Sequence, residues 1–313
     1  MKKKYTRIIS FFLKIFILIA FIYYLSIKIK PSKLLGYLKD LDLTFLLIAV
    51  VLFIAGKIFN ILKWRFIVKR NKEVSDYDII ASIFGGYTLS IITPGRLGEM
   101  GRFLFINNVD FREIVSYTAL DKIFNITINI VFGLIIFLLF PLKYPLSLKL
   151  FVLVVAFLVF SLILSYIFIP KRLYYLLVKI PFLRKKKNRK FIKVLKESNK
   201  KDNFIIFAFS ILTYLFFLVE FIFLSISFQL NTLMVAAKGF MLSLFLKTAL
   251  PITVAEWGIK EISLMEYYSL EGFSSEIALS AAFFLYILNI VIPSIIGLIF
   301  VLKEGVYNGR KKQ

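Results

Sequence analysis

Long apolar runs recur from one end of the sequence to the other, and each is long enough to cross a bilayer. A transmembrane helix needs about 20 consecutive apolar residues. Segments that meet this requirement are approximately 8–27, 43–62, 115–140, 148–169, 204–226 and 277–302. Hydrophobic residues make up 60% of the chain, more than is typical of a soluble domain. The longest polar stretch, about residues 170–202, is too short and too rich in lysine to bury a core of its own. We therefore predict an all-α, polytopic membrane helix bundle, a single transmembrane domain over residues 1–313 with a basic loop at about 170–202.

The N-terminus has a basic stretch, Met1–Arg7, before the apolar run 8–27. A signal peptide begins in the same way. The apolar run is long, however, and Tyr23, Tyr24 and Lys28 stand where a small-residue cleavage site would be needed. We expect an uncleaved first transmembrane helix.

Basic residues between the apolar runs predict the orientation. Segment 170–202 carries thirteen Lys and Arg, segment 63–78 carries five, and the chain ends in Arg310-Lys-Lys312. The positive-inside rule places these segments and both termini in the cytoplasm of a multi-pass plasma-membrane protein. Loops 141–147 and 227–237 are poor in basic residues and are expected outside. Loop 28–40, with four Lys, is an exception to this pattern.

Two further apolar stretches, about 79–106 and 235–268, are interrupted by Pro, Gly and charge. If 79–106 crossed completely, the loop with thirteen basic residues would lie outside. We therefore predict that 79–106 enters and leaves on the cytoplasmic face and that 235–268 does so from the outside. The favoured topology has about six full spans and two re-entrant broken-helix segments among eight hydrophobic segments. The alternative is eight helices that all cross.

The two interrupted stretches have related sequences. The first reads Leu89-Ser-Ile-Ile-Thr-Pro-Gly-Arg-Leu-Gly-Glu99, and the second reads Leu246-Lys-Thr-Ala-Leu-Pro-Ile-Thr-Val-Ala-Glu-Trp-Gly-Ile-Lys-Glu261. Each contains a proline followed by glycine, a basic residue and a glutamate. Paired interruptions of this kind indicate a transport site near the bilayer midplane. Proline and glycine permit a non-helical turn there, so the expected structural hinges are Pro94, Gly95, Gly98, Pro251 and Gly258.

Charged residues in the first stretch are candidate ligands for a substrate. Spacings of three put Arg96, Glu99 and Arg102 on one face if the segment is helical. Charge inside the membrane marks a functional site by default, and Arg forms bidentate contacts with phosphate oxygens. The alternative is a structural pair between Arg96 and Glu99, with Arg102 extended to the interface.

Other ionisable residues extend this set. Glu256 and Lys260 are four residues apart with Glu261 beside them, either as ligands or as a structural ion pair. Asp121 is placed to pair with Arg96 or Arg102, and its neighbour Lys122 points elsewhere on the helix. The full set of predicted substrate-binding residues is Arg96, Glu99, Arg102, Asp121, Glu256, Lys260 and Glu261.

Further polar residues lie inside apolar runs. A carboxylate as deep as Glu220 must be protonated, paired or in contact with water. Asn125, Asn129 and Asn289 are interpreted as interhelical hydrogen-bonding residues.

Charge and missing residue types limit the function classes. The formal charge of +23 is accounted for by the positive-inside rule and by anionic membrane lipids, without a nucleic-acid partner. The chain has no Cys and no His, so it lacks a thiolate nucleophile and the usual general base and metal ligand. We expect no metal, no cofactor and no catalytic residues, as in a transporter rather than an enzyme.

The residues of the two interrupted stretches resemble the lysylphosphatidylglycerol synthase transmembrane-region family, also called flippase-like domain proteins. The resemblance rests on Thr93-Pro-Gly-Arg-Leu-Gly-Glu99 with Arg102, on Leu250-Pro-Ile and Gly258-Ile-Lys-Glu261, and on the Asp121-Lys122 pair, and it covers nearly the whole chain. It implies a membrane domain that moves a lipid head group between leaflets. Lys260 departs from the Arg common in the family. The soluble aminoacyl-transferase domain of the full synthases is absent, so lysine transfer to lipid is not expected.

The leading hypothesis is therefore a lipid flippase that moves a phospholipid or a lipid-linked head group. Intramembrane transfer onto a lipid-linked substrate, with Glu99 or Asp121 as base, is the second hypothesis. A third is a non-catalytic membrane partner of a lipid or glycan biosynthetic complex. A membrane-protein partner and a homo-oligomer both remain open.

Overall fold

The computed structural model describes residues 31–70, 72–91, 93–107, 109–139, 169–185, 188–249, 253–254 and 257–310, with isolated positions between 150 and 165. The predicted span 8–27 lies outside the described residues, and the predicted span 148–169 does so for the most part. Apart from two very short strands, the described elements are helices, which confirms the predicted all-α class.

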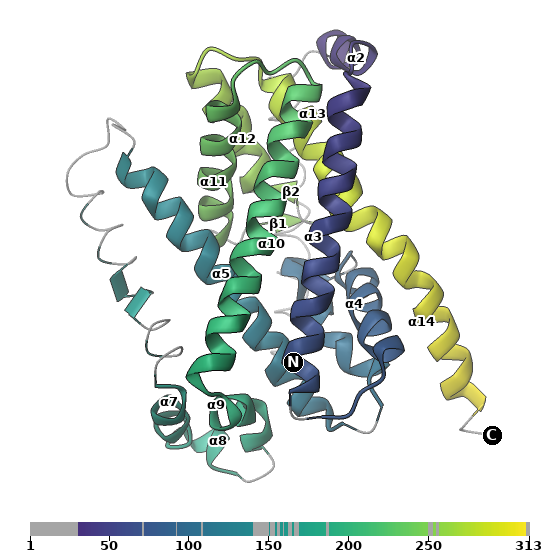
Figure 1. Ribbon diagram of the computed structural model, residues 1–313, viewed down its shortest axis with the longest axis vertical. Coiled ribbons are helices and arrows are strands. Elements are labelled where there is room, and N and C mark those ends of the chain that lie inside the picture. Colours follow the sequence, from purple (N-terminus) through teal and green to yellow (C-terminus); the bar gives the residue numbers. More distant parts are fainter. Residues whose placement is uncertain are drawn as a thin grey trace, which may run out of the picture.

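Four long helical runs form the frame of the bundle (Figure 1). They are α3 (Leu43–Lys69), α5 (Phe111–Leu139), α10 (Lys200–Ser227), and a run made of α13 (Ser275–Tyr286), the π-helical turn η3 (Ile287–Val291) and α14 (Ile292–Arg310). All four are long and apolar enough to cross a membrane. They coincide with four of the predicted spans, because apolar runs of this length bury their backbone polar groups only as helices.

Helix α3 is longer than predicted, which corrects the interpretation of residues 63–78 as a loop. The side chain of Asp42 caps the helix start by accepting hydrogen bonds from the amides of Thr44 and Phe45. No Gly or Pro interrupts residues 57–69, so the helix continues to Lys69. Lys63, counted as a loop residue, is fully buried inside the bundle.

Shorter helices lie at the two ends of the molecule. Helix α2 (Pro31–Lys39) is at one end, and α7 (Pro170–Leu177), α8 (Pro181–Arg184), the 3₁₀-helix η2 (Asn188–Ile192) and α9 (Lys193–Glu197) are at the other (Figure 1). The basic segment is fixed to the start of α5 by ion pairs of Lys190 Nζ with Asp110 Oδ2 at 2.7 Å and of Lys193 Nζ with Glu113 Oε1 at 3.0 Å.

The first interrupted stretch forms a helical hairpin. Helix α4 (Asp76–Ile91) is followed by an extended residue, Thr93, and then by the 3₁₀-helix η1 (Pro94–Phe105), which packs back along α4. A Cβ at Gly98 would collide with the backbone carbonyl of Leu89, so this close approach requires glycine. The predicted irregular turn at Pro94 and Gly95 is corrected in detail: the chain turns around residue 93, and residues 94–105 are 3₁₀-helical.

The second interrupted stretch forms another hairpin. Helix α11 (Leu233–Ala249) packs against α12 (Ile259–Leu270), and the tip contains the antiparallel strands β1 (Thr253–Val254) and β2 (Trp257–Gly258). Gly258 has φ 141°, a conformation that residues with a Cβ rarely adopt, which fits its predicted role as a hinge. Its amide donates to Glu261 Oε2 at 2.9 Å.

The two hairpins come from opposite ends of the bundle. In Figure 1, α4 lies in the half that contains α7, α8 and α9, whereas α11 and α12 lie in the other half. Strand β1 lies beside η1, so the hairpins meet at their tips. The arrangement brings two segments about 150 residues apart in the sequence to one region between the long helices.

Candidate functional site

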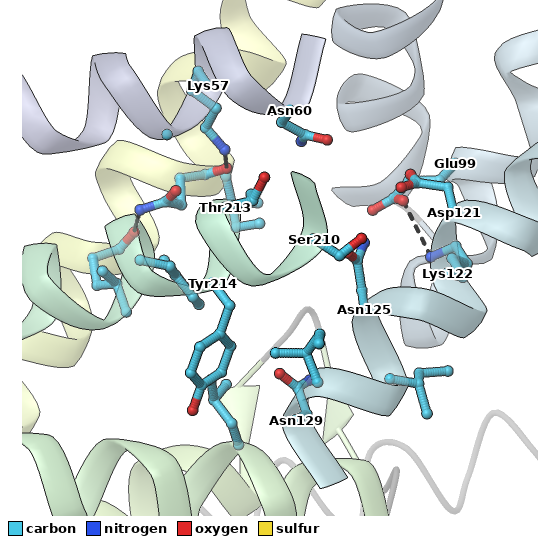
Figure 2. A pocket seen from close by; sticks show the side chains of 18 of the residues that line it. Lys57, Asn60, Glu99, Asp121, Lys122, Asn125, Asn129, Ser210, Thr213 and Tyr214 are labelled. Carbon is cyan, nitrogen blue, oxygen red and sulfur yellow. Dashed lines mark hydrogen bonds and ion pairs between the residues drawn. The ribbon is translucent and has the colours of Figure 1, made fainter. Parts of the chain in front are cut away.

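A cavity of about 420 Å³ lies where the hairpins meet the long helices. Its wall contains residues of α3, α4, η1, α5, α10, α11, α12, α13 and η3. Figure 2 shows polar side chains of α3, α5 and α10 arranged around it. The ionisable Lys, Arg, Asp and Glu residues of the described lining are Lys57, Glu99, Arg102, Asp121, Lys122, Glu220, Lys247 and Lys260. Five are basic and three are acidic, so the cavity favours an anion.

Arg102 lies at the centre of a buried ion-pair network. Its side chain is 3% exposed, with Nη1 3.1 Å from Asp121 Oδ2 and Nη2 3.5 Å from Glu99 Oε2. The 3₁₀ geometry of η1 stacks residues three apart on one face, which places Glu99 beside Arg102. The guanidinium carbon is 4.5 Å from the centre of the Trp64 ring. Arg102 therefore does not extend to the interface, and that alternative is wrong.

The neighbours Asp121 and Lys122 contact different partners, as their adjacent positions on one helix predict. Asp121 Oδ1 is 2.7 Å from Lys63 Nζ, and Lys122 Nζ is 3.1 Å from Glu99 Oε2. Of the two partners predicted for Asp121, Arg96 or Arg102, the structure shows Arg102. Lys63 is missing from the predicted set because it was counted in a loop. Such buried charges are tolerated only when each has a partner of opposite sign.

The second hairpin contributes Lys260 to the cavity wall. Lys260 Nζ is 3.1 Å from Glu261 Oε1, while the other oxygen of Glu261 accepts from the Gly258 amide. Glu261 is fully buried and does not line the cavity, so it orients the hairpin tip and Lys260. Glu256, the expected partner of Lys260, lies outside the described residues, so the structure does not test this pair.

The π-helical turn η3 in the α13–α14 run provides a further polar contact. Pro293 has no amide hydrogen, so the carbonyl of Asn289, four residues before it, lacks the usual helical donor. Lys57 Nζ donates to this carbonyl at 3.2 Å and also to Tyr87 OH at 3.2 Å. Asn60 Nδ2 also donates to Tyr87 OH, at 3.1 Å. Sequence reasoning missed Lys57 and Tyr87, although a lone lysine within an apolar run is a signal of this kind of site.

The side chain of Asn289 connects η3 to α10. Its Nδ2 donates to Glu220 Oε1 at 2.6 Å, which gives Glu220 the partner that its depth requires. The other two asparagines are also interhelical: Asn125 Oδ1 accepts from Lys63 Nζ at 2.7 Å, and Asn129 Nδ2 donates to Thr248 Oγ1 at 3.3 Å. The interpretation of the three asparagines as interhelical hydrogen-bonding residues is confirmed.

The structure thus brings four predicted site residues, Glu99, Arg102, Asp121 and Lys260, to one cavity. Glu261 lies directly behind Lys260. Pro251 and Glu256 lie outside the described residues, and for Pro94, Gly95 and Arg96 only the backbone is described. Gly98 packs inside the first hairpin, and Gly258 shapes the tip of the second.

A family model described as the lysylphosphatidylglycerol synthase TM region matches residues 11–297. The chain belongs to this family. The match covers most of the sequence and confirms the resemblance found in the two interrupted stretches. Searches of curated proteins and of solved structures found no match. As a lysylphosphatidylglycerol synthase TM-region protein, the chain is a multi-pass membrane protein, and its two motif segments form the hairpins that meet at the cavity.

Proposed function

We propose that this protein is a lipid translocase that moves a phospholipid or lipid-linked head group between the two leaflets. The observation that carries the proposal is that ionisable side chains of both hairpins line one cavity among helices long enough to cross a bilayer. Charge at such depth is unfavourable unless it is paired or faces water. A polar cavity of this kind would let a polar head group move between the leaflets without entering the hydrocarbon core of the bilayer.

We also infer that both hairpins are re-entrant and enter from opposite faces. Helix α4, along which η1 packs back, lies in the half of the molecule that holds α7, α8 and α9 of the basic segment, and α11 and α12 occupy the other half (Figure 1). With the predicted spans 8–27 and 148–169, the chain then has six full crossings. The basic segment and both termini lie in the cytoplasm under the positive-inside rule.

The charge of the cavity favours an anionic head group. Five basic side chains face three carboxylates in the described lining. The buried Nε of Arg102 donates no hydrogen bond to any described residue, so Glu99 and Asp121 do not use all the donors of this guanidinium. Apolar lining residues, among them Phe53, Ile126 and Phe217, leave room for the start of the acyl chains, which stay in the bilayer.

A leaflet-resolved assay tests the proposal. The protein is reconstituted into vesicles that contain phosphatidylglycerol with a fluorescent acyl chain, and an impermeant reductant then bleaches only the label in the outer leaflet. We expect the protein to expose inner-leaflet label, with or without an imposed ion gradient. Lys122→Gln and Lys260→Gln should slow this exposure. Arg172→Gln should not, because Arg172 is an exposed residue of α7 far along the chain from the cavity lining.

The same vesicles separate the competing functions. Bleaching equal to that of protein-free vesicles under every gradient would contradict a translocase. New head groups on the recovered lipids would instead support transfer chemistry. If the vesicles show neither faster exposure of inner-leaflet label nor new head groups, the result would favour a non-catalytic partner in a biosynthetic complex.

A further inference from the structure

A second, smaller hollow lies at the seam between α3 and α10. It has a volume of about 360 Å³ and is lined by Leu62, Arg65, Phe66, Lys69, Arg70 and Phe209. None of these residues lines the large cavity. The lining combines three basic side chains with three large apolar ones. Along α3, Leu62 comes first, Arg65 and Phe66 are adjacent, and Lys69 and Arg70 come last.

Helical spacing explains how these residues come to line one hollow. Leu62, Phe66 and Arg70 are four residues apart and form one stripe of α3. Leu62 and Phe66 are deeper in the span, and Arg70 stands at its end, about 12 Å along the axis from Leu62 and about 6 Å from Phe66. Phe209 of α10 completes the apolar part. Arg65 lies level with Phe66, and Lys69 and Arg70 lie at the helix end, so the hollow becomes more basic towards that end. A phospholipid has the same change from apolar to charged.

Arg70 carries unused hydrogen-bonding capacity. Its side chain is 7% exposed, and Nη1 lies 3.5 Å from Asp202 Oδ2. Its Nε, Nη1 and Nη2 are buried and donate no hydrogen bond to any described residue. Asp202 Oδ2 already accepts from Asn199 Nδ2 at 2.9 Å. A guanidinium taken out of water without hydrogen-bond acceptors is unfavourable, and a phosphate would supply oxygens in the fork geometry that Arg binds best.

The charges around Arg70 leave a positive excess. Arg65 Nε is 2.6 Å and Lys69 Nζ is 2.8 Å from Asp76 Oδ1. The three basic residues of the lining pair with two carboxylates, Asp76 and Asp202, so the lining and its ion-pair partners carry one positive charge in excess. This excess matches a single phosphodiester group.

We propose that the hollow binds an anionic phospholipid of the leaflet on the side of the basic segment 170–202. Arg70 holds the head-group phosphate, Arg65 and Lys69 add positive charge, and an acyl chain lies against Leu62, Phe66 and Phe209. The apolar half of the hollow selects a lipid over free phosphate. Because α3 and α10 pack along their lengths, the bound lipid would stabilise this helix pair. The site is independent of the proposed translocation path.

The first test measures unfolding in detergent with added lipid. We expect phosphatidylglycerol to raise the unfolding midpoint and phosphatidylcholine or inorganic phosphate at equal concentration to leave it unchanged. Arg70→Gln should weaken the apparent affinity for phosphatidylglycerol about tenfold or more, since it removes a charge-assisted phosphate contact. The charge-matched control Arg172→Gln should keep the full effect. An undiminished shift in Arg70→Gln, or an equal shift with phosphatidylcholine or phosphate, would overturn the proposal.

A second test does not depend on the folding of an Arg70 variant. Phe209→Trp places a fluorophore in the apolar half of the hollow, and the native tryptophans serve as the background. Phosphatidylglycerol brominated on its acyl chains should quench the added tryptophan more strongly than brominated phosphatidylcholine at the same mole fraction. Equal quenching by the two lipids would show that the hollow has no preference for anionic lipid and would refute the site.

Discussion

Arg102 and Asp121 form an ion pair inside the bundle, with Nη1 and Oδ2 3.1 Å apart and both side chains almost fully buried. The pair joins η1 of the first hairpin to the long helix α5. Lys63 of α3 binds the other oxygen of Asp121 at 2.7 Å. One carboxylate thus holds three elements together at the cavity wall.

Replacing Asp121 should therefore destabilise the protein strongly. In Asp121→Asn, Lys63 and Arg102 lose the charge that both share, and breaking a buried pair typically costs about 3–5 kcal/mol. We expect a large drop in the unfolding midpoint in detergent. Glu73→Gln removes an acidic charge from an exposed position and should change little. A midpoint for Asp121→Asn equal to that of Glu73→Gln would contradict the structural role.

The close packing of the first hairpin gives a second prediction. In Gly98→Ala the added methyl group would collide with the Leu89 carbonyl, and neither backbone can yield without opening the hairpin. Overpacking of this kind costs about 1–3 kcal/mol or more. Gly36→Ala is the matched control, because a Cβ there meets nothing within 4 Å. Thermal unfolding of both variants, with translocation as a second readout, checks the expectation, and equal stability of the two would refute it.

The contact between Glu220 and Asn289 can be tested by a double-mutant cycle. Asn289 Nδ2 donates to Glu220 Oε1 at 2.6 Å. Glu220→Leu removes the acceptor of this bond and Asn289→Leu removes the donor, so each single change leaves the other side chain without this partner. An unsatisfied buried group costs about 1–3 kcal/mol. The double variant should therefore lose less stability than the sum of the two single variants. Additive losses would show that the two side chains do not stabilise each other.

The long helices and the two interrupted stretches were predictable because each depends on local composition. About 20 apolar residues can only cross a bilayer as a helix, and Pro, Gly and charge in such a run stand out. The pairing of Asp121 was accessible in part: a buried carboxylate needs a cation, which led to Arg96 or Arg102 as partners, and the structure shows Arg102 together with Lys63. The spacing of apolar residues does not show that η1 packs back against α4. The turn between them was therefore predicted at Pro94 and Gly95, and the structure has it around residue 93.

Lys57 and Lys63 show why part of the site was missed. Counting basic residues assigns a lysine near a helix end to a loop, but Lys63 is turned inward by the continuation of α3 and meets Asp121. The acceptor for Lys57 is a backbone carbonyl exposed by Pro293, more than 200 residues away in the sequence. The contact between Lys57 and Asn289 forms only because their two helices are neighbours in the bundle. The hydropathy of a sequence does not show which helices are neighbours.

The salt bridge between Asp110 and Lys190 predicts a pH-dependent attachment of the basic segment. The Lys190 ammonium beside it holds the pKa of the Asp110 carboxyl below its usual range. A carboxyl with a lowered pKa contributes stability above the usual carboxyl pKa and loses it as the pH falls through the lowered value. Residues 188–197 should therefore stay attached at neutral and mildly acidic pH and loosen in stronger acid.

Hydrogen–deuterium exchange of the peptide 188–197 measures this attachment, with intrinsic rates corrected for pH. Lys190→Gln should increase exchange a few-fold at neutral pH, because a partly exposed pair contributes about 0.2–1 kcal/mol. Lys196→Gln is the control, since Lys196 is an exposed residue of the same segment. Equal exchange in the two variants would show that the pair does not hold the segment in place.

The re-entrant topology predicts on which side of the membrane the flanks of each hairpin lie. Glu73 precedes α4 and Asn107 follows η1, so single cysteines at both positions should be protected from an impermeant thiol reagent added to intact cells. Asn231 precedes α11 and Glu271 follows α12, so cysteines there should both react. The native chain has no Cys, and every signal therefore comes from the introduced residue. A helix that crosses completely puts its two flanks on opposite sides. If Glu73→Cys and Asn107→Cys, or Asn231→Cys and Glu271→Cys, differ in labelling in intact cells but not in permeabilised cells, that hairpin crosses the membrane and is not re-entrant.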